Sequence, residues 1–229
     1  YGCTTSDMVI VNQYDSIQIV IEEKINVSCY DSADGSIEVS AFFGVSPYTW
    51  QWDTTQSTTV NDTNSLADGL QVGTYTVTVT DNVGCQGVAE DIQITQPAPL
   101  QLLATVLAHV SCYSGDNGKV EVTVSGGTSA YNYLWQNGEM TSIATNLSAG
   151  INICTVTDAN GCVESIPVTL NEPNEFLIVD TIVVDNLCAG ESNGEITVIA
   201  NGGAPPYDSY HLQNSSGNIT SQNSNIFTN

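Results

Sequence analysis

The sequence predicts an all-β protein in which tandem β-sandwich repeats, stapled by disulfides, form a rod. Three observations support this fold class. Cysteines recur at alternating short and long intervals, β-branched residues alternate with polar ones, and Gly paired with Asn or Asp marks turns between these segments. We find no apolar stripe of useful length with helical spacing. The chain is therefore expected to fold as a series of similar β modules.

The cysteines set the period of the repeat. Short intervals of 26 or 27 residues alternate with long intervals of 56 and 50 residues. The short intervals separate Cys3 from Cys29, Cys85 from Cys112, and Cys162 from Cys188. From Cys29 to Cys112 is 83 residues and from Cys112 to Cys188 is 76, so each period carries two cysteines. A seventh cysteine, Cys154, lies outside this rhythm.

Residues around the cysteines repeat in step with them. A short distance after each of three cysteines, an Asn-Gly or Asp-Gly pair opens a β-like segment; these pairs are Asp34-Gly35, Asn117-Gly118 and Asn193-Gly194. Cys85 and Cys162 each end a Thr-Asp-x-x-Gly-Cys segment. Prolines near residues 97 and 173 mark copy boundaries. The predicted organisation is the end of a preceding repeat in 1–13, a first repeat in 14–97, a second in 98–173 and a partial third in 174–229.

Each copy has the strand pattern of a sandwich. Thr76-Val77-Thr78-Val79-Thr80 alternates with period two, and turn residues bound about seven such short segments per copy. Leu70-x-x-Gly73-x-Tyr75 resembles the tyrosine corner of immunoglobulin-like sandwiches. The second copy has Asn152 where the first has Tyr75. We therefore predict immunoglobulin-like sandwiches.

Composition excludes several classes of partner. The chain has 2 Lys and Arg residues against 25 Asp and Glu, for a formal net charge of −23. The two basic residues are Lys24 and Lys119, too few to bind nucleic acid or an anionic membrane surface. No apolar run approaches the ~20 residues of a membrane span, so no membrane insertion is expected.

The paired cysteines indicate disulfides formed in an oxidising compartment. No Cys-x-x-Cys pair of a metal site is present. Pairing within copies, Cys29 with Cys85 and Cys112 with Cys162, is the first expectation. The alternative joins adjacent copies, for example Cys29 to Cys162. Within-copy pairing would leave Cys3 and Cys188 without partners, and Cys154, which aligns with Val77, is expected to be a buried free thiol.

Two further groups of residues have alternative interpretations. Asp31, Asp34 and Asp116 could supply oxygens to calcium, or could bond their own backbone in turns. No other cofactor is expected. Trp50, Trp52 and Trp135 could stack on sugars. Alternation, however, places Trp50 and Trp52 on one face of their strand, and Trp135 likewise in the second copy, which favours the core. No catalytic motif is present, and a catalytic site would break the repeat, so the chain is not expected to be an enzyme.

Taken together, the motifs resemble the SprB-type repeat, which occurs in very large cell-surface adhesins of gliding Bacteroidetes. The resemblance depends on the cysteine, the Asn-Gly or Asp-Gly strand, Gly-Gly, an aromatic strand and the Val-Thr-Asp-x-x-Gly-Cys turn. The aromatic strand reads Pro47-Tyr48-Thr49-Trp50 in the first copy and Tyr131-Asn132-Tyr133-Leu134-Trp135 in the second. The third copy has no Trp, and the first has a single glycine, Gly44, in place of Gly-Gly.

The resemblance implies export by type IX secretion, an extracellular location at the cell surface, and outer-membrane motility or secretion machinery as a partner of the parent protein. It also implies O-glycan addition at Asp-Ser or Asp-Thr motifs, with Ser16, Ser32, Thr54 and Thr181 as candidates. The predicted function is a segment of a long adhesin or filament, a mechanical stalk in adhesion and gliding whose partners are neighbouring repeats and a surface polysaccharide or substratum. The alternatives are a carbohydrate-binding repeat module and an accessory module of a secreted enzyme.

Overall fold

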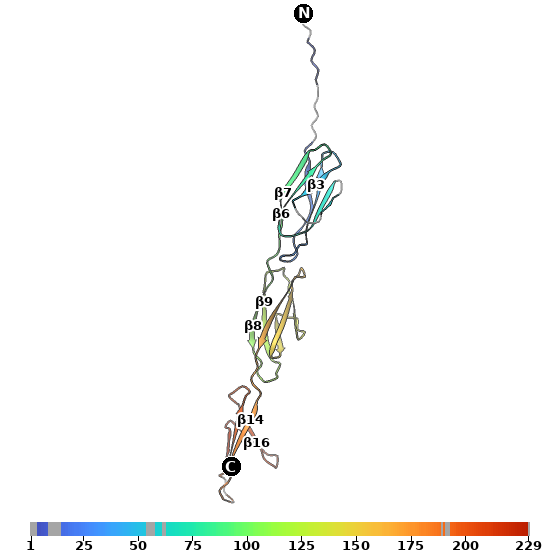
Figure 1. Cartoon of the computed structure of the whole chain (residues 1–229). Coiled ribbons are helices and arrows are strands. Elements are labelled where there is room, and N and C mark those ends of the chain that lie inside the picture. The colour runs from blue at the N-terminus through green and yellow to red at the C-terminus, as the bar shows by residue number, and fades with distance from the viewer. Residues whose placement is uncertain are drawn as a thin grey trace. The chain divides into compact units, whose positions relative to one another are not determined.

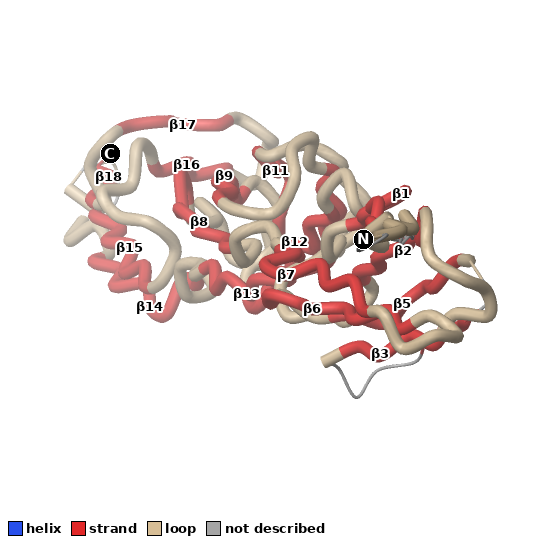
Figure 2. The backbone as a smooth tube through the Cα atoms, turned by 90° about the horizontal axis from the view of Figure 1, so that it is seen from above, coloured by secondary structure: helices blue, strands red, loops and turns tan. Residues whose placement is uncertain are grey.

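All regular structure in the described residues is β-strand, as predicted. The computed structural model describes residues 4–8, 15–53, 58–60 (backbone only), 63–188, 190 and 193–228. Figure 2 shows only strands and loops in this part of the chain. Among these residues there is no helix with the length and apolarity that a membrane crossing requires. The strands form three groups that follow the three sequence copies.

The first copy folds into two antiparallel sheets. Its strands are β1 (Gln18–Ile25), β2 (Gly35–Phe42), β3 (Thr49–Trp52), β4 (Thr58–Val60), β5 (Asn64–Leu70), β6 (Gly73–Thr80) and β7 (Gln86–Ile94). One sheet has the order β1-β2-β5-β4, and the other, labelled in Figure 1, has the order β3-β6-β7. Two sheets of this kind make the predicted sandwich.

The core of this sandwich forms because alternate residues of its inner strands are apolar. Ile37 and Val39 of β2 and Val77 and Val79 of β6 are each 0% exposed and belong to one cluster. Burying one such side chain stabilises the fold by about 1.5–3 kcal/mol. The period-two pattern seen in the sequence therefore holds the two sheets together.

The second copy repeats this architecture with one strand fewer among the described residues. Its strands are β8 (Gln101–Ala108), β9 (Gly118–Ser125), β10 (Asn132–Trp135), β11 (Ile143–Leu147), β12 (Gly150–Thr157) and β13 (Val163–Leu170). The sheets have the orders β11-β9-β8 and β10-β12-β13. Val120, Val122, Trp135 and Val156 lie in its buried cluster.

The predicted tyrosine corner is present in the first copy. The Tyr75 hydroxyl donates to the carbonyl oxygen of Gln71 at 2.9 Å. In the second copy Asn152 Nδ2 donates to the carbonyl oxygen of Ser148 at 3.0 Å. Both bonds reach back four residues, so the shorter amide side chain makes the same closure as the phenol.

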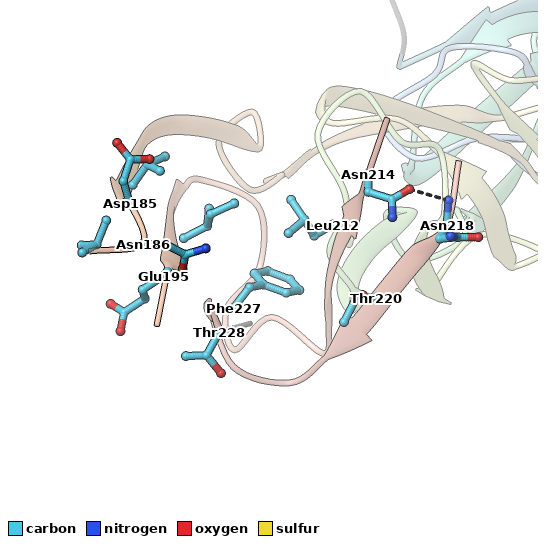
Figure 3. Close-up of a pocket in the computed structure, with 13 residues that line it drawn as sticks. Asp185, Asn186, Glu195, Leu212, Asn214, Asn218, Thr220, Phe227 and Thr228 are labelled. Carbon is cyan, nitrogen blue, oxygen red and sulfur yellow. Dashed lines mark hydrogen bonds between the residues drawn. The ribbon is translucent and has the colours of Figure 1, made fainter. Parts of the chain in front are cut away.

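The third copy differs because its apolar face is open. Its strands are β14 (Leu177–Val184), β15 (Glu195–Asn201), β16 (Tyr210–Gln213), β17 (Ile219–Gln222) and β18 (Ile226–Thr228). They form a β14-β15-β18 sheet and a β16-β17 pair. Every residue of β14 is exposed. A cavity of about 330 Å³ opens between these strands, with Leu212 and Phe227 turned into it (Figure 3).

Compactness divides the chain slightly differently from the sequence copies. The first compact unit takes the described residues of 1–100 together with 126–130 and 158–162, and the second takes 101–125, 131–157 and the described part of 163–229. Residues 98–100, 126–130 and 158–162 of the second sequence copy therefore pack with the first copy. They include Thr128, Asn160 and Cys162, which lie at the junction with the Cys29 loop of the first copy.

Candidate functional site

The loop before the second strand of each copy has a recurring structure. Its closing bond runs from a backbone N–H to a side-chain oxygen six residues later. The three bonds are Ser28 N to Asp34 Oδ1 (3.0 Å), Ser111 N to Asn117 Oδ1 (2.9 Å) and Leu187 N to Asn193 Oδ1 (3.1 Å). The residue after each donor is a cysteine. We call Cys29, Cys112 and Cys188 the loop cysteines.

The first two loops are also hydrogen-bonded to residues just past the last strand of their own copy. The Asp31 amide donates to Gln96 Oε1 at 2.8 Å, and the Ser114 amide donates to Glu172 Oε2 at 2.6 Å. Asp31 and Ser114 both have a left-handed backbone, with φ of 62° and 56°. Val27 N also donates to Thr95 O at 3.0 Å. The loops of Cys29 and Cys112 are thus held against the last residues of their own copies.

A second recurring structure is the turn between the last two strands of the first and second copies. In the first copy, Asp81 Oδ1 accepts the amides of Val83 (3.0 Å) and Cys85 (2.8 Å). Its Oδ2 accepts the amide of Val45 at 3.0 Å. One carboxylate therefore satisfies three backbone donors and fixes the position of Cys85.

Asp158 builds the same turn in the second copy. Its Oδ1 accepts the amides of Asn160 and Cys162, both at 2.9 Å, and its Oδ2 accepts the amide of Thr128 at 2.7 Å. We call Cys85 and Cys162 the turn cysteines. The two classes of cysteine thus occupy two distinct and well-defined backbone settings.

The aspartates that build these structures are held ionised. Burial opposes the ionisation of Asp81 and Asp158, but the backbone amides that point at each carboxylate outweigh it, so the pKa of both groups lies below its ordinary value. Hydrogen bonds from the side chain and then the amide of Ser28 lower the pKa of Asp34. At neutral pH all three are therefore charged acceptors.

One disulfide joins the two classes of cysteine. Cys29, a loop cysteine of the first copy, is bonded to Cys162, a turn cysteine of the second, with their Cα atoms 5.7 Å apart. The bonded residues lie in one compact unit. Beside the bond, Asn160 Nδ2 donates to the carbonyl oxygen of Ser28 at 2.8 Å and to Thr128 Oγ1 at 3.2 Å. The turn is thus both cross-linked and hydrogen-bonded to the loop.

The expected pairing within copies is wrong, and the strand geometry explains why. The Cys29 loop is bonded to residues 95 and 96, just past the end of β7, whereas Cys85 lies just before the start of β7. A strand of nine residues spans about 30 Å at about 3.4 Å per residue. A disulfide needs Cα atoms about 4.4–6.8 Å apart, so these two cysteines cannot pair. Pairing between adjacent copies, the alternative, is the one observed.

The remaining cysteines are free thiols where the structure describes them. Cys85, Cys112 and Cys188 are exposed, while Cys154 is buried, as predicted from its alignment with Val77. Burial raises the pKa of the Cys154 thiol, against a smaller opposing effect of the Leu134 backbone. Cys3 lies outside the described residues.

The three tryptophans proposed as sugar ligands lie in the cores. Trp50 and Trp52 are 9% exposed and Trp135 is 1% exposed. Trp52 Nε1 donates to Ser65 Oγ and Trp135 Nε1 donates to the carbonyl oxygen of Thr141, both at 2.9 Å. No described atom accepts from Trp50 Nε1. None of these rings presents a face to solvent on which a sugar could stack.

The calcium candidates are placed in turns. Asp31, Asp34 and Asp116 are exposed. The Asp34 carboxylate accepts hydrogen bonds from both the amide and the hydroxyl of Ser28. This agrees with the alternative in which the residue stabilises a turn. Among the described residues, no group of three or more His, Cys, Asp or Glu side chains is placed to hold a metal ion.

The glycosylation candidates have different settings. Ser16 is exposed just before β1, and Thr181 is exposed on β14. Ser32 is half-buried in the Cys29 loop. Thr54 lies outside the described residues.

Sequence reasoning missed the residues that hold the junction together. Asp81 and Asp158 were part of the repeated motif, but their role as acceptors for three amides was not inferred. Gln96 and Asn160 were also missed. For the aspartates the signal was present, since Asp recurs four residues before each turn cysteine.

The family model described as SprB repeat matches residues 22–57, 104–140 and 181–217. Each matched stretch contains one loop cysteine and the strand that follows it. The chain carries three SprB-type repeat stretches. The Asp81 and Asp158 turns lie outside the matched stretches of these SprB repeats, so the junction partners come from different parts of each copy.

A comparison with curated protein sequences finds no match. Among solved structures, the SprB repeats are similar to a C-terminal fragment of intimin in complex with the intimin-binding domain of its translocated receptor. The identity is 11%, the TM-score is 0.35, and 71% of this chain and 66% of that chain are covered. The N-terminal eight Ig domains of Down Syndrome Cell Adhesion Molecule match with 13% identity, a TM-score of 0.38, and coverage of 84% and 28%. The SprB repeat chain thus spans just under two thirds of the intimin fragment and a smaller share of the other chain.

Proposed function

We propose that this chain is a non-enzymatic, extracellular segment of a cell-surface adhesin, in which the SprB-type copies act as a mechanical stalk. The observation that carries this proposal is the Cys29–Cys162 disulfide. It joins successive copies rather than stapling each one internally. A covalent cross-link between successive copies resists their separation under tension. A load-bearing chain needs this property.

The strand pairing supports the same role. β1 and β2 pair in an antiparallel ladder from Gln18 with Phe42 to Ile25 with Ser36, and β8 and β9 pair in the same way. A pull along such strands loads the ladder bonds in parallel, because those bonds run perpendicular to the strands. The net charge of −23 keeps neighbouring chains apart and soluble.

We further propose that the parent protein leaves the cell by type IX secretion and contributes to gliding. Its proposed partners are neighbouring repeats, the outer-membrane motility and secretion machinery, and a substratum or surface polysaccharide contacted elsewhere in the parent protein. The SprB repeat matches support this proposal, since the repeat type is the feature shared with gliding adhesins.

Live-cell fluorescence with a fragment antibody against residues 14–173 tests the proposal in the cells that produce the protein. Label on intact cells that travels along the cell body is the expected result. Surface label that does not move would support the stalk proposal and overturn the proposed role in gliding. Label found only in the medium would overturn the surface-adhesin proposal and favour an accessory module of a secreted enzyme.

A glycan array with the whole chain separates the stalk from a carbohydrate-binding module. We expect no binding, because the three tryptophan rings are buried. Binding that disappears when the exposed Tyr30 and Tyr113 are changed to Ala, with the fold intact by circular dichroism, would favour the binding module instead.

A further inference from the structure

The third copy lacks a partner for its apolar face among the described residues. In the second copy, the β12–β13 hairpin completes the sandwich, and Val156 and Leu170 of this hairpin are 0% and 1% exposed. In the third copy no described strand takes that place, and β16 pairs with β17. Ile196 and Val198 of the inner strand β15 are only half-buried, whereas the corresponding Val120 and Val122 of β9 are 0% and 1% exposed. Leu212 and Phe227 face a cavity of about 330 Å³ (Figure 3).

A second cavity lies beside the free loop cysteine Cys112. It has a volume of about 460 Å³ and is lined by Ser111, Cys112, Tyr113, Phe176, Gly203 and Tyr207 among others. Cys112 itself is exposed and unbonded. This cavity and the open apolar face belong to the same compact unit.

The counterpart of this second cavity in the first copy is filled. There Cys29 is bonded to Cys162, and Ser28 O accepts from Asn160. Asp158 accepts the amide of Thr128, next to Gly127. The filling element is therefore the turn 158–162.

The framing backbone is the same at both places. Gly127 and Gly203 have the same φ of 59°, and each donates to a carbonyl of the preceding linker, Ala98 at 2.9 Å and Asn174 at 2.7 Å. The Cys112 loop is closed by Asn117 as the Cys29 loop is closed by Asp34. The backbone around the cavity at Cys112 thus has the same structure as the backbone around the site at Cys29 that the turn 158–162 occupies.

We propose that the third copy is the seat of a β-hairpin of the β12–β13 type, supplied by sequence that follows Asn229, whose Asp-x-x-Gly-Cys turn fills the cavity at Cys112 and forms a disulfide with it. The general rule is that the loop cysteine of one copy bonds the turn cysteine of the next. By this rule Cys85, a free turn cysteine, would form a disulfide with the loop cysteine of a preceding copy.

The bond forms by oxidation of two thiols. The Cys112 and turn-cysteine sulfurs join, and the two thiol protons and two electrons pass to a small-molecule disulfide such as oxidised glutathione, which is cleaved to two thiols. Disulfides of this kind form and persist in oxidising environments outside the cytoplasm.

The chain itself provides the segment for a test. β18 pairs Phe227 with Ile196, as β11 pairs Ala144 with Val120, so the next residues of the third copy correspond to those after Asn146. We would therefore append a second copy of residues 147–171 directly after Asn229. In the appended segment Val replaces the cysteine equivalent to Cys154, as in the first copy, so only the turn cysteine is added.

The extended chain is oxidised with glutathione, alkylated and mapped by mass spectrometry without reduction. We expect a cross-linked peptide that contains Cys112 and the appended turn cysteine, and complete loss of Cys112 alkylation. Cys29–Cys162 should persist, and Cys85 and Cys188 should remain alkylated. A bond from the appended cysteine to Cys188, or a free appended cysteine, overturns the disulfide rule.

A second measurement tests docking without the bond. The extended chain with Ser in place of the appended cysteine is compared with the original chain by hydrogen exchange. We expect slower exchange of the amides of β16, because the hairpin pairs with that strand as β12 pairs with β10. Unchanged exchange overturns the docking proposal. Neither result depends on cell-surface location, so the stalk proposal is tested separately.

Discussion

The turn at Asp81 and the turn at Asp158 have the same hydrogen bonds but different covalent states. Each aspartate accepts three amides at 2.7–3.0 Å, and each turn ends in a cysteine. Yet Cys85 is an exposed free thiol, whereas Cys162 is bonded to Cys29. The aspartate is therefore sufficient to shape the turn. The disulfide is additional, and it forms where a loop cysteine lies beside the turn.

Removing the disulfide is expected to have the largest effect on this comparison. Cys162→Ser should lower the free energy of unfolding by about 2–4 kcal/mol, because the cross-link restricts the unfolded chain. Urea denaturation without reductant measures this loss. Cys85→Ser is the matched control and should leave the midpoint unchanged. Equal losses in both variants would show that the side chain, and not the bond, supports the turn.

Acid should weaken both turns together. The pKa values of Asp81, Asp158 and Asp34 are lowered in the folded protein, so their contribution to stability is complete above the unfolded pKa of about 3.9. That contribution is lost as the pH falls through the lower, folded pKa values. The measurement is made in high salt, which screens repulsion in this acidic chain. The melting temperature should stay constant as the pH is lowered to about 5, and it should decrease once the pH is below about 4. A melting temperature that stays constant to pH 2 would contradict the role of these carboxylates.

Changes at Tyr75 and Asn152 should lower the free energy of unfolding by less than loss of the disulfide does, and by similar amounts. Tyr75→Phe removes the hydrogen bond to the Gln71 carbonyl, and Asn152→Ala removes the bond to the Ser148 carbonyl together with a longer one to the Gly150 carbonyl. Each change should cost about 0.5–1.5 kcal/mol. Urea denaturation compares them with Tyr113→Phe, an exposed tyrosine for which a change within about 0.5 kcal/mol is expected. A loss confined to Tyr75 would mean that the amide of Asn152 does not replace the phenol.

The smallest effect is expected at the loop acceptor. Asp34→Asn should change the free energy of unfolding by less than about 0.5 kcal/mol, since Asn117 and Asn193 make the same bond with a neutral side chain. Thermal melting checks this, and the variant should also lose part of the acid sensitivity. A large loss would indicate that the charge of Asp34 matters beyond the hydrogen bond to Ser28.

The fold could be predicted because its determinants are local and repeated. Alternation in 76–80 gave the buried Val77 and Val79 of β6, and the spacing from Leu70 to Tyr75 gave the corner. The alignment of Cys154 with Val77 gave a buried thiol. Each of these depends on residues close together in the sequence, where period and turn chemistry are sufficient.

The disulfide partner could not be read from the same patterns. Cys29 and Cys162 are 133 residues apart, and their spacing alone is compatible with pairing inside or between copies. The decision comes from which end of the sandwich each cysteine occupies. That requires the strand topology, because β7 separates Cys85 from the Cys29 loop by its full length. The role of Asp158 toward Thr128 was hidden for the same reason.

The sequence separation of the Cys29–Cys162 bond also sets how far the chain can lengthen under tension. A pull applied at the two ends passes through the sulfur–sulfur bond, so the chain between the cysteines, whose sequence separation is 133 residues, forms a closed loop outside the force path. At about 3.3–3.6 Å per extended residue, about 440–480 Å of contour length stays hidden until the bond is reduced. Strands β2 to β12 lie inside that loop, while β1 and β13 lie outside it. The redox state of one bond thus decides whether two modules can unravel or are held at fixed length.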